Sequence, residues 1–208
     1  MTKTLDYYNN SAEIYNEVTF NIDFENKQTL LLKYLQPGSH ILDLGCGSGR
    51  DSKVFIEKGY KVTAVDGSKE LCKIASENIG QTVICQTFDQ LEASNEYDGV
   101  WACASLLHLP TNELKEILLK IERALKPNGY FYASFKYGEF EGERDGRFFN
   151  DFTETSFNQL LVNFPSLIIE ELEVTVDVIP GREDVKWLNA IIKKYIKVTL
   201  ETKTQALQ

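Results

Sequence analysis

The chain has 208 residues, of which 43% are hydrophobic and 25% are charged, and its formal net charge at pH 7 is −9. This length and composition predict one domain with one sizeable core. The acidic balance disfavours a nucleic-acid substrate, because proteins that bind phosphate backbones usually carry a basic face. No stretch approaches the ~18 apolar residues of a membrane span, so we expect a cytoplasmic protein without membrane contact.

The cysteine pattern argues against a bound metal. Cys46, Cys72, Cys85 and Cys103 show no C-x-x-C pairing and have no histidine close by in the sequence. They match neither a zinc site nor a disulfide framework. We therefore expect buried free thiols and no metal ligands.

Predicted helices and strands alternate along most of the chain. In chain order we expect helices at 5–17 and 23–35, a strand at 40–45, a helix at 50–58, a strand at 61–66, a helix at 69–78, strands at 82–86 and 97–104, a helix at 113–125, a strand at 130–136 and a helix at 153–164. This alternation predicts a parallel sheet with right-handed crossovers and helices on both faces.

The C-terminal third departs from that alternation. Residues 137–151 are charged and contain Gly138, Gly142 and Gly146, so we expect a polar loop that uses these glycines as hinges. Segments 167–178 and 187–194 leave no room for a crossover helix between them. They should form an antiparallel hairpin at one edge of the sheet.

A glycine-rich loop, Asp43-Leu-Gly45-Cys-Gly47-Ser-Gly49, joins the first predicted strand to the next helix. Glycine lets the backbone approach a ligand closely, and the helix that follows offers free N–H groups. A dinucleotide site prefers G-x-G-x-x-G, but this chain has Arg50 at the third glycine position. We expect Asp43 to point into the pocket beside the loop, where a carboxylate suits an ammonium group and repels a pyrophosphate. This disfavours an NAD-dependent oxidoreductase.

Asp66 ends the second predicted strand, about 20 residues beyond the glycine motif, where an acid accepts hydrogen bonds from ribose hydroxyls. The expected ligand therefore carries a ribose and a cationic end but no pyrophosphate. S-adenosylmethionine meets these conditions.

Five segments resemble the class I S-adenosylmethionine-dependent methyltransferases, particularly a small bacterial group related to tellurite-resistance and ubiquinone-biosynthesis enzymes. They are YYNNSAEIYNE, ILDLGCGSG, VTAVDGS, YDGVWACASLLHLP and ALKPNGYFYASF, within residues 5–136. The resemblance implies a Rossmann-like α/β fold with a seven-stranded sheet in the order 3-2-1-4-5-7-6, whose last inserted strand is antiparallel. It implies one domain over 1–208, with an N-terminal helical lid (1–36), a cofactor-binding core (37–136), an acceptor-side loop, helix and hairpin (137–196), and a tail (197–208).

The resemblance also implies the contacts of the cofactor, S-adenosylmethionine. The loop glycines would lie under its methionine part and Asp66 would hold its ribose. Phe88 and Asp89 compete for the adenine contact, Ala104 would offer its carbonyl to the methionine amino group, and Tyr15 would close over the cofactor. The full set of expected cofactor-binding residues is Tyr15, Asp43, Gly45, Cys46, Gly47, Asp66, Gly67, Ser68, Phe88, Asp89 and Ala104.

The acceptor side is expected around the fourth and fifth strands. His108 is a candidate general base because the pKa of histidine lies near neutrality, and a hydrogen-bonded structural histidine is the alternative. Charges and rings in and around residues 137–151 favour an anionic or aromatic acceptor, with a solvated loop as the alternative. We expect Trp187 in the core. The candidate acceptor-binding residues are Lys136, Arg147, Phe149 and Arg182.

Together these patterns predict a methyltransferase that acts on a small molecule, as a monomer or homodimer. The alternative from another class is a non-catalytic sensor or subunit that binds the same cofactor.

Overall fold

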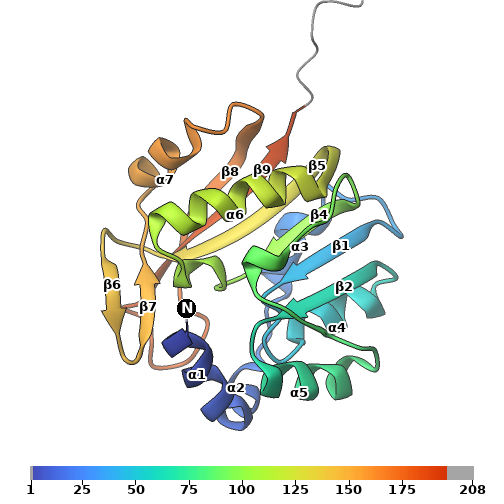
Figure 1. Ribbon diagram of the computed structural model, residues 1–208, viewed down its shortest axis with the longest axis vertical. Coiled ribbons are helices and arrows are strands. Elements are labelled where there is room, and N and C mark those ends of the chain that lie inside the picture. Colours follow the sequence, from blue (N-terminus) through green and yellow to red (C-terminus); the bar gives the residue numbers. More distant parts are fainter. Residues whose placement is uncertain (1, 196–208) are drawn as a thin grey trace, which may run out of the picture.

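The computed structural model describes residues 2–195, which contain a seven-stranded sheet with helices on both faces (Figure 1). In spatial order the strands are β3 (Ile84–Cys85), β2 (Lys61–Asp66), β1 (His40–Leu44), β4 (Tyr97–Ala102), β5 (Leu125–Lys136), β9 (Lys186–Lys194) and β8 (Leu167–Val176). The first five are parallel, and β9 pairs antiparallel with both β5 and β8. The expected strand order and C-terminal hairpin are therefore confirmed. The predicted tail, 197–208, lies outside the described residues.

The helices are divided between the two faces of the sheet. Helices α3 (Glu25–Leu32), α4 (Arg50–Glu57) and α5 (Lys69–Ile79) cover one face, and α6 (Thr111–Ala124) and α7 (Glu154–Leu161) cover the other. Helices α1 (Thr2–Asn10) and α2 (Ala12–Thr19) pack beside α5, away from both layers (Figure 1). They thereby lie close to the carboxyl ends of the parallel strands, where open α/β sheets bind their ligands.

Alternate residues of the central strands fill two separate cores. Ile41 packs with residues of α3 and α4, whereas the adjacent Leu42 packs with residues of α6. On the α3 side, the rings of Trp101 and Tyr132 stack with their centroids 3.9 Å apart, and both are completely buried. Both faces of the sheet are thus buried, as parallel strands require.

The structure corrects three predicted elements. The opening helix, expected at 5–17, is two helices separated at Ser11, which has φ −117°. The third strand is shorter than expected, because only Ile84–Cys85 pairs with β2. The expectation of a polar loop at 137–151 is wrong, since most of these residues form an antiparallel hairpin of β6 (Glu141–Arg144) and β7 (Arg147–Asn150).

The hairpin turn explains why that loop prediction failed. Asp145 and Gly146 have φ values of 51° and 75°, and two positive φ values at the centre of a two-residue turn match the type I′ turn that Asp-Gly favours. Arg144 is then bound through both of its terminal nitrogens to Asp151, at 2.9 and 2.8 Å. Gly146 therefore supplies a positive φ that this turn requires.

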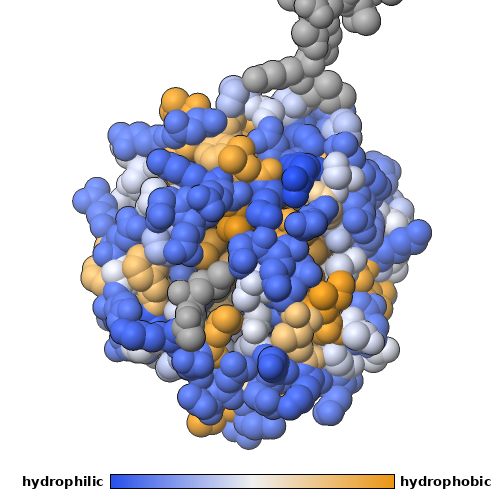
Figure 2. Space-filling model, in the orientation of Figure 1, coloured by the Kyte–Doolittle hydropathy of each residue, from blue (hydrophilic) through white to orange (hydrophobic). Residues whose placement is uncertain are grey.

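Hydrophilic side chains cover most of the face seen in Figure 2, with smaller hydrophobic areas between them. Within the described part of the chain, no helix has the length and apolar character needed to cross a membrane.

Candidate functional site

The glycine loop after β1 is held against the neighbouring strand. The backbone N–H groups of Gly45 and Cys46 both donate to the carbonyl of Val65, at 2.8 and 2.9 Å. Gly45 has φ 84°, and a Cβ there would lie 2.5 Å from Cβ of Ser105. No other residue fits at this position without moving the loop.

Asp66, at the end of β2, connects this loop to the next one. One carboxylate oxygen accepts from the N–H of Gly47 at 2.9 Å and the other from the N–H of Ser68 at 2.8 Å. Burial raises the pKa of Asp66 to about 6, so the group is still mainly ionised at pH 7. Each carboxylate oxygen can accept a second hydrogen bond, which leaves Asp66 with capacity for two hydroxyl donors.

A small cavity of 60 Å³ lies between this strand end and α1. From the sheet side it is lined by Gly45, Gly47, Asp66, Gly67 and Phe88, and from α1 by Thr4, Leu5 and Tyr8. A Cβ on Gly67 would lie 2.8 Å from Cδ2 of Leu5, and one on Gly47 would lie 3.0 Å from the Tyr15 ring. The first two helices therefore rest directly on the glycine backbone.

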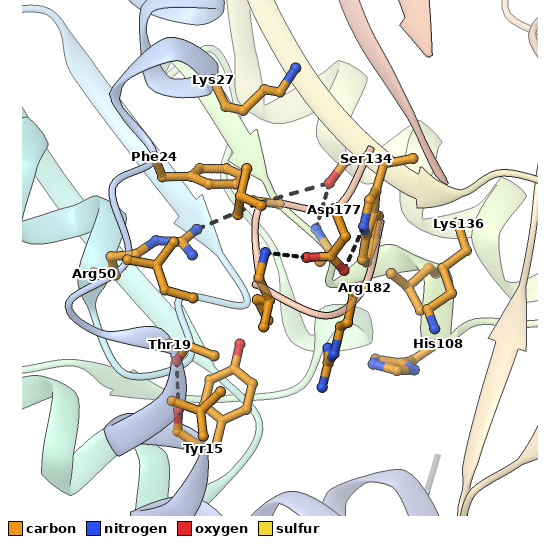
Figure 3. A pocket seen from close by; sticks show the side chains of 18 of the residues that line it. Tyr15, Thr19, Phe24, Lys27, Arg50, His108, Ser134, Lys136, Asp177 and Arg182 are labelled. Carbon is orange, nitrogen blue, oxygen red and sulfur yellow. Dashed lines mark hydrogen bonds between the residues drawn. The ribbon is translucent and has the colours of Figure 1, made fainter. Parts of the chain in front are cut away.

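A larger cavity of 290 Å³ adjoins the small one (Figure 3). It lies between the first three helices, the ends of β4 and β5, and the segment between β8 and β9. The two cavities share five lining residues: Tyr8, Tyr15, Cys103, Ala104 and His108. A group bound in one cavity is therefore adjacent to a group bound in the other.

His108 stands at this junction, in the 3₁₀ turn η2 (Leu106–His108) after β4. Its Nδ1 lies 2.7 Å from the carbonyl oxygen of Phe148, which can only accept, so Nδ1 carries the hydrogen. Nε2 then accepts from the hydroxyl of Tyr8 at 2.8 Å. Burial lowers the pKa of His108 to about 4, so the ring is neutral at physiological pH.

The four candidate acceptor-binding residues all line the larger cavity. Lys136 ends β5, Arg147 and Phe149 lie on β7, and Arg182 lies between β8 and β9. In Figure 3 the side chains of Lys136 and Arg182 both extend toward the part of the cavity beside His108. Residues from three separate segments of the chain are thus brought to one site.

Asp43 does not take the position that its sequence context suggested. The residue is 2% exposed, its carboxyl group accepts from Oγ of Ser52 at 2.6 Å, and it lines neither cavity. The alternation along β1 turns this side chain toward α4, and burial raises its pKa to about 8. The expectation that Asp43 points into the pocket is wrong.

Three further candidate cofactor residues also lie away from the cavities. Cys46 packs in the cluster beneath the loop, Ser68 caps α5 by accepting from the N–H of Leu71, and Asp89 is exposed. The other candidates from the loop and strand ends, together with Tyr15, line the small cavity.

Sequence reasoning missed several polar residues of the larger cavity. Ser134 and Asn189 are buried partners on β5 and β9, and Asn189 accepts from the hydroxyl of Tyr132. The sequence signal that could have found them is that each interrupts the apolar run of its strand with a polar side chain. Trp187, expected in the core, lines the cavity and donates through Nε1 to Asp177 at 3.1 Å.

Comparisons with known proteins agree with this arrangement. Residues 41–129 match the family model described as a methyltransferase domain. A putative methyltransferase of Bacillus subtilis, YqeM, is 31% identical over 144 residues, which cover 64% of this chain and 58% of that protein. The chain spans about half the length of the curated relatives it matches.

Solved structures of similar fold include the 1,6-didemethyltoxoflavin-N1-methyltransferase of Burkholderia thailandensis, with bound 1,6-didemethyltoxoflavin and S-adenosylhomocysteine. Its TM-score is 0.73 at 21% identity, covering 92% of this chain and 85% of that one. The [4+2]-cyclase SpnF has a TM-score of 0.71 at 17% identity, covering 92% and 94%. At these identities the likeness establishes the fold and not the reaction.

In its methyltransferase-domain match, its strand order and its glycine loop over Asp66, the chain is similar to the class I S-adenosylmethionine-dependent methyltransferases. The matched residues run from β1 into the first part of β5.

Proposed function

We propose that this chain transfers the methyl group of S-adenosylmethionine to a small-molecule acceptor. The observation that carries the proposal is the pair of adjoining cavities, one beside the glycine loop and Asp66, the other lined by cations and aromatic rings. The junction at Tyr8, Tyr15, Ala104 and His108 is where a donor in the first and an acceptor in the second would meet.

The residues of the small cavity fit the proposed cofactor. Asp66 retains acceptor capacity for two ribose hydroxyls, and the Phe88 ring forms a wall suited to a flat base. Gly45, Gly47 and Gly67 let the ligand approach the backbone closely, while Ala104 and Tyr15 border the methyl end. When bound, S-adenosylmethionine supplies a methyl group on a positively charged sulfur. The protein's part is then to hold donor and acceptor in line and to exclude water.

We assign His108 a positioning role and not that of a general base. Both ring nitrogens already have partners, and the lowered pKa leaves little tendency to accept a proton at neutral pH. The ring instead fixes the hydroxyl of Tyr8 at the junction of the cavities.

The size of the larger cavity supports a small-molecule acceptor, because small-molecule pockets commonly enclose about 300–1,000 Å³. Lys136, Arg147, Phe149 and Arg182 are its proposed contacts. We also propose that the protein acts as a monomer or a homodimer. We further propose one domain with the N-terminal helical segment, residues 1–36, as its lid. A cytoplasmic location would suit the four free cysteines, since thiols stay reduced there.

Two linked assays test the proposal. Calorimetry should show micromolar binding of S-adenosylhomocysteine and no comparable binding of NAD. A fractionated metabolite extract should then support conversion of S-adenosylmethionine to S-adenosylhomocysteine above the rate without extract. Binding without any turnover would favour a sensor or subunit, and absence of binding would contradict the proposal.

A further inference from the structure

Five cationic side chains line the larger cavity, and they fall into two groups. Lys27 and Arg50 lie on the side formed by α3 and α4, and each is paired with an acid, Glu173 and Asp51 respectively. The other three form what we call the cationic wall, on the side formed by β5, β7 and the segment between β8 and β9. Its members are Lys136, Arg147 and Arg182.

No member of the cationic wall has an acid within 4.0 Å among the described residues. One acid, Asp177, belongs to the cavity lining: the N–H of Ile179 donates to one of its oxygens at 2.9 Å and Trp187 donates to the other at 3.1 Å, and none of the three cations of the wall pairs with it. Within residues 2–195, this side of the cavity therefore holds three unpaired cations against one acid, an excess of positive charge in a chain that is strongly acidic as a whole.

Arg147 provides a second observation, which concerns hydrogen bonding and does not depend on the number of charges. Its Nε is buried and has no hydrogen-bond partner within the described part of the chain. The guanidinium lies 4.3 Å from the ring centroid of Tyr7 and 5.0 Å from that of Phe149. One terminal nitrogen donates to the hydroxyl of Tyr8 at 3.4 Å, but Nε stays unsatisfied, and an unsatisfied buried donor costs about 1–3 kcal/mol. Such a donor in a native protein points to a partner that binds there.

The positive charges around Lys136 also favour a bound anion. Burial lowers the pKa of Lys136, and the positive charges of Arg144, Arg147 and Arg182 lower it further, while Asp151 opposes them. Since Arg144 is already bound to Asp151, it is not available to a ligand. A bound anion would relieve the repulsion among the three members of the cationic wall.

We infer that the methyl acceptor is an anion, carrying a carboxylate or phosphate that binds Lys136, Arg147 and Arg182, on a flat body that packs among the aromatic rings of the cavity. This inference rests on the proposed function. The guanidinium fork of Arg147 matches the geometry of either group, and the rings of Phe24 and Trp187 in the lining suit a planar skeleton. The carboxylate of the cofactor is another negative group that the cationic wall could bind, so the test has to distinguish it from an anionic acceptor.

The test measures binding and needs no turnover. The full chain, saturated with S-adenosylhomocysteine, is titrated by calorimetry with 2-naphthoate, with phenyl phosphate and with the neutral 2-naphthamide. We expect at least one of the anions to bind at least tenfold more tightly than the amide. Arg147→Met and Lys136→Met should each remove most of that preference, whereas Lys27→Met, a cavity cation with its own acid partner, should keep it. Arg147→Lys, which retains the charge without the fork, should keep part of it.

Three results would overturn the inference. They are equal binding of the acids and the amide by the parent, no binding of any probe, and an unchanged preference in the Arg147→Met and Lys136→Met variants. Weaker S-adenosylhomocysteine binding in Arg147→Met, with the preference intact, would assign the cations to the cofactor carboxylate and overturn it too. Thermal midpoints identify variants that fail to fold, and Arg147→Lys then decides. Lack of methyl transfer would contradict the proposed function. The binding result could still be interpreted, because the titration needs no turnover.

Discussion

The hydroxyl of Tyr8 donates to Nε2 of His108 across 2.8 Å, while Nδ1 of the same ring is bound to the carbonyl of Phe148 at 2.7 Å. Three segments distant in sequence, α1, η2 and β7, are thereby joined through one imidazole. Thr4 strengthens the connection, since its Oγ1 accepts from the N–H of Phe148 at 3.2 Å. The first helix is fastened to the acceptor side of the site by buried polar groups.

Tyr8→Phe should loosen that helix. The variant keeps the ring but leaves Nε2 of His108 buried without a donor, at a cost of about 1–3 kcal/mol. Hydrogen exchange followed by mass spectrometry should show faster exchange in residues 2–10. Tyr7→Phe is the matched control, because the hydroxyl of Tyr7 has no side-chain partner in the described structure. Equal protection of α1 in both variants would contradict the assigned contact.

The lowered pKa of His108 predicts a defined loss of stability in acid. The unfolded chain binds a proton at His108 near pH 6.5, whereas the folded chain does so only near pH 4. The contribution of neutral His108 to the free energy of unfolding is therefore fully present above pH 6.5. It is lost as the pH falls toward 4, and the total loss is about 3 kcal/mol. Urea unfolding of His108→Gln at pH 7.5 and 4.5 should show a smaller loss than the parent. A loss equal to that of the parent would contradict the buried neutral ring, and His40→Gln controls for the other histidine.

Cofactor binding should require movement of α1. The small cavity of 60 Å³ holds about four to six water molecules at about 10–15 Å³ each, far fewer atoms than an adenosine contains. Leu5, which touches Gly67, is the side chain that closes it. Leu5→Ala should therefore bind S-adenosylhomocysteine with a severalfold faster association rate, monitored by the fluorescence of Trp187. Leu119→Ala, at a position 57% exposed on α6, should leave the rate unchanged. An unchanged rate in Leu5→Ala would show that α1 is not the barrier.

Asp66 should be the main polar anchor of the cofactor. Asp66→Ala removes the acceptor of both ribose hydroxyls, at about 1.5–3 kcal/mol for each hydrogen bond to a charged group, and also releases the N–H of Gly47. Calorimetry with S-adenosylhomocysteine should show at least a tenfold loss of affinity. The nearby exposed Asp89→Ala should bind like the parent. Equal affinity of the two variants would exclude the ribose assignment.

The strands of the sheet were predictable because each strand of the core is an apolar run bounded by glycine or polar turns, and the strand order was predictable from the resemblance to the class I methyltransferases. HILDLG and KVTAVD also end at the residues that surround the small cavity, so Gly45, Gly47 and Asp66 were found from sequence. The C-terminal hairpin followed from the short connection around Pro180-Gly181, which leaves no room for a helix.

Side-chain direction was harder to predict. Asp43 and Leu42 are adjacent on a strand buried on both faces, so composition does not say which of them faces the ligand, and Asp43 faces α4. The hairpin at 141–150 was missed because its strands are rich in charge, while its Asp-Gly turn is a strong signal of a two-residue type I′ connection. The orphaned Nε of Arg147 depends on contacts between α1 and β7 that no local pattern encodes.

Transfer of an isotopically labelled methyl group tests the account most directly. The full chain is incubated with S-adenosylmethionine carrying a deuterated methyl group and with a metabolite extract, and products are examined by mass spectrometry. The account predicts a small molecule that gains one labelled methyl group, with an equal amount of S-adenosylhomocysteine, and a strong reduction of both in Asp66→Ala but not in Asp89→Ala. Binding of the cofactor with no labelled product in any fraction would contradict the proposed methyl transfer.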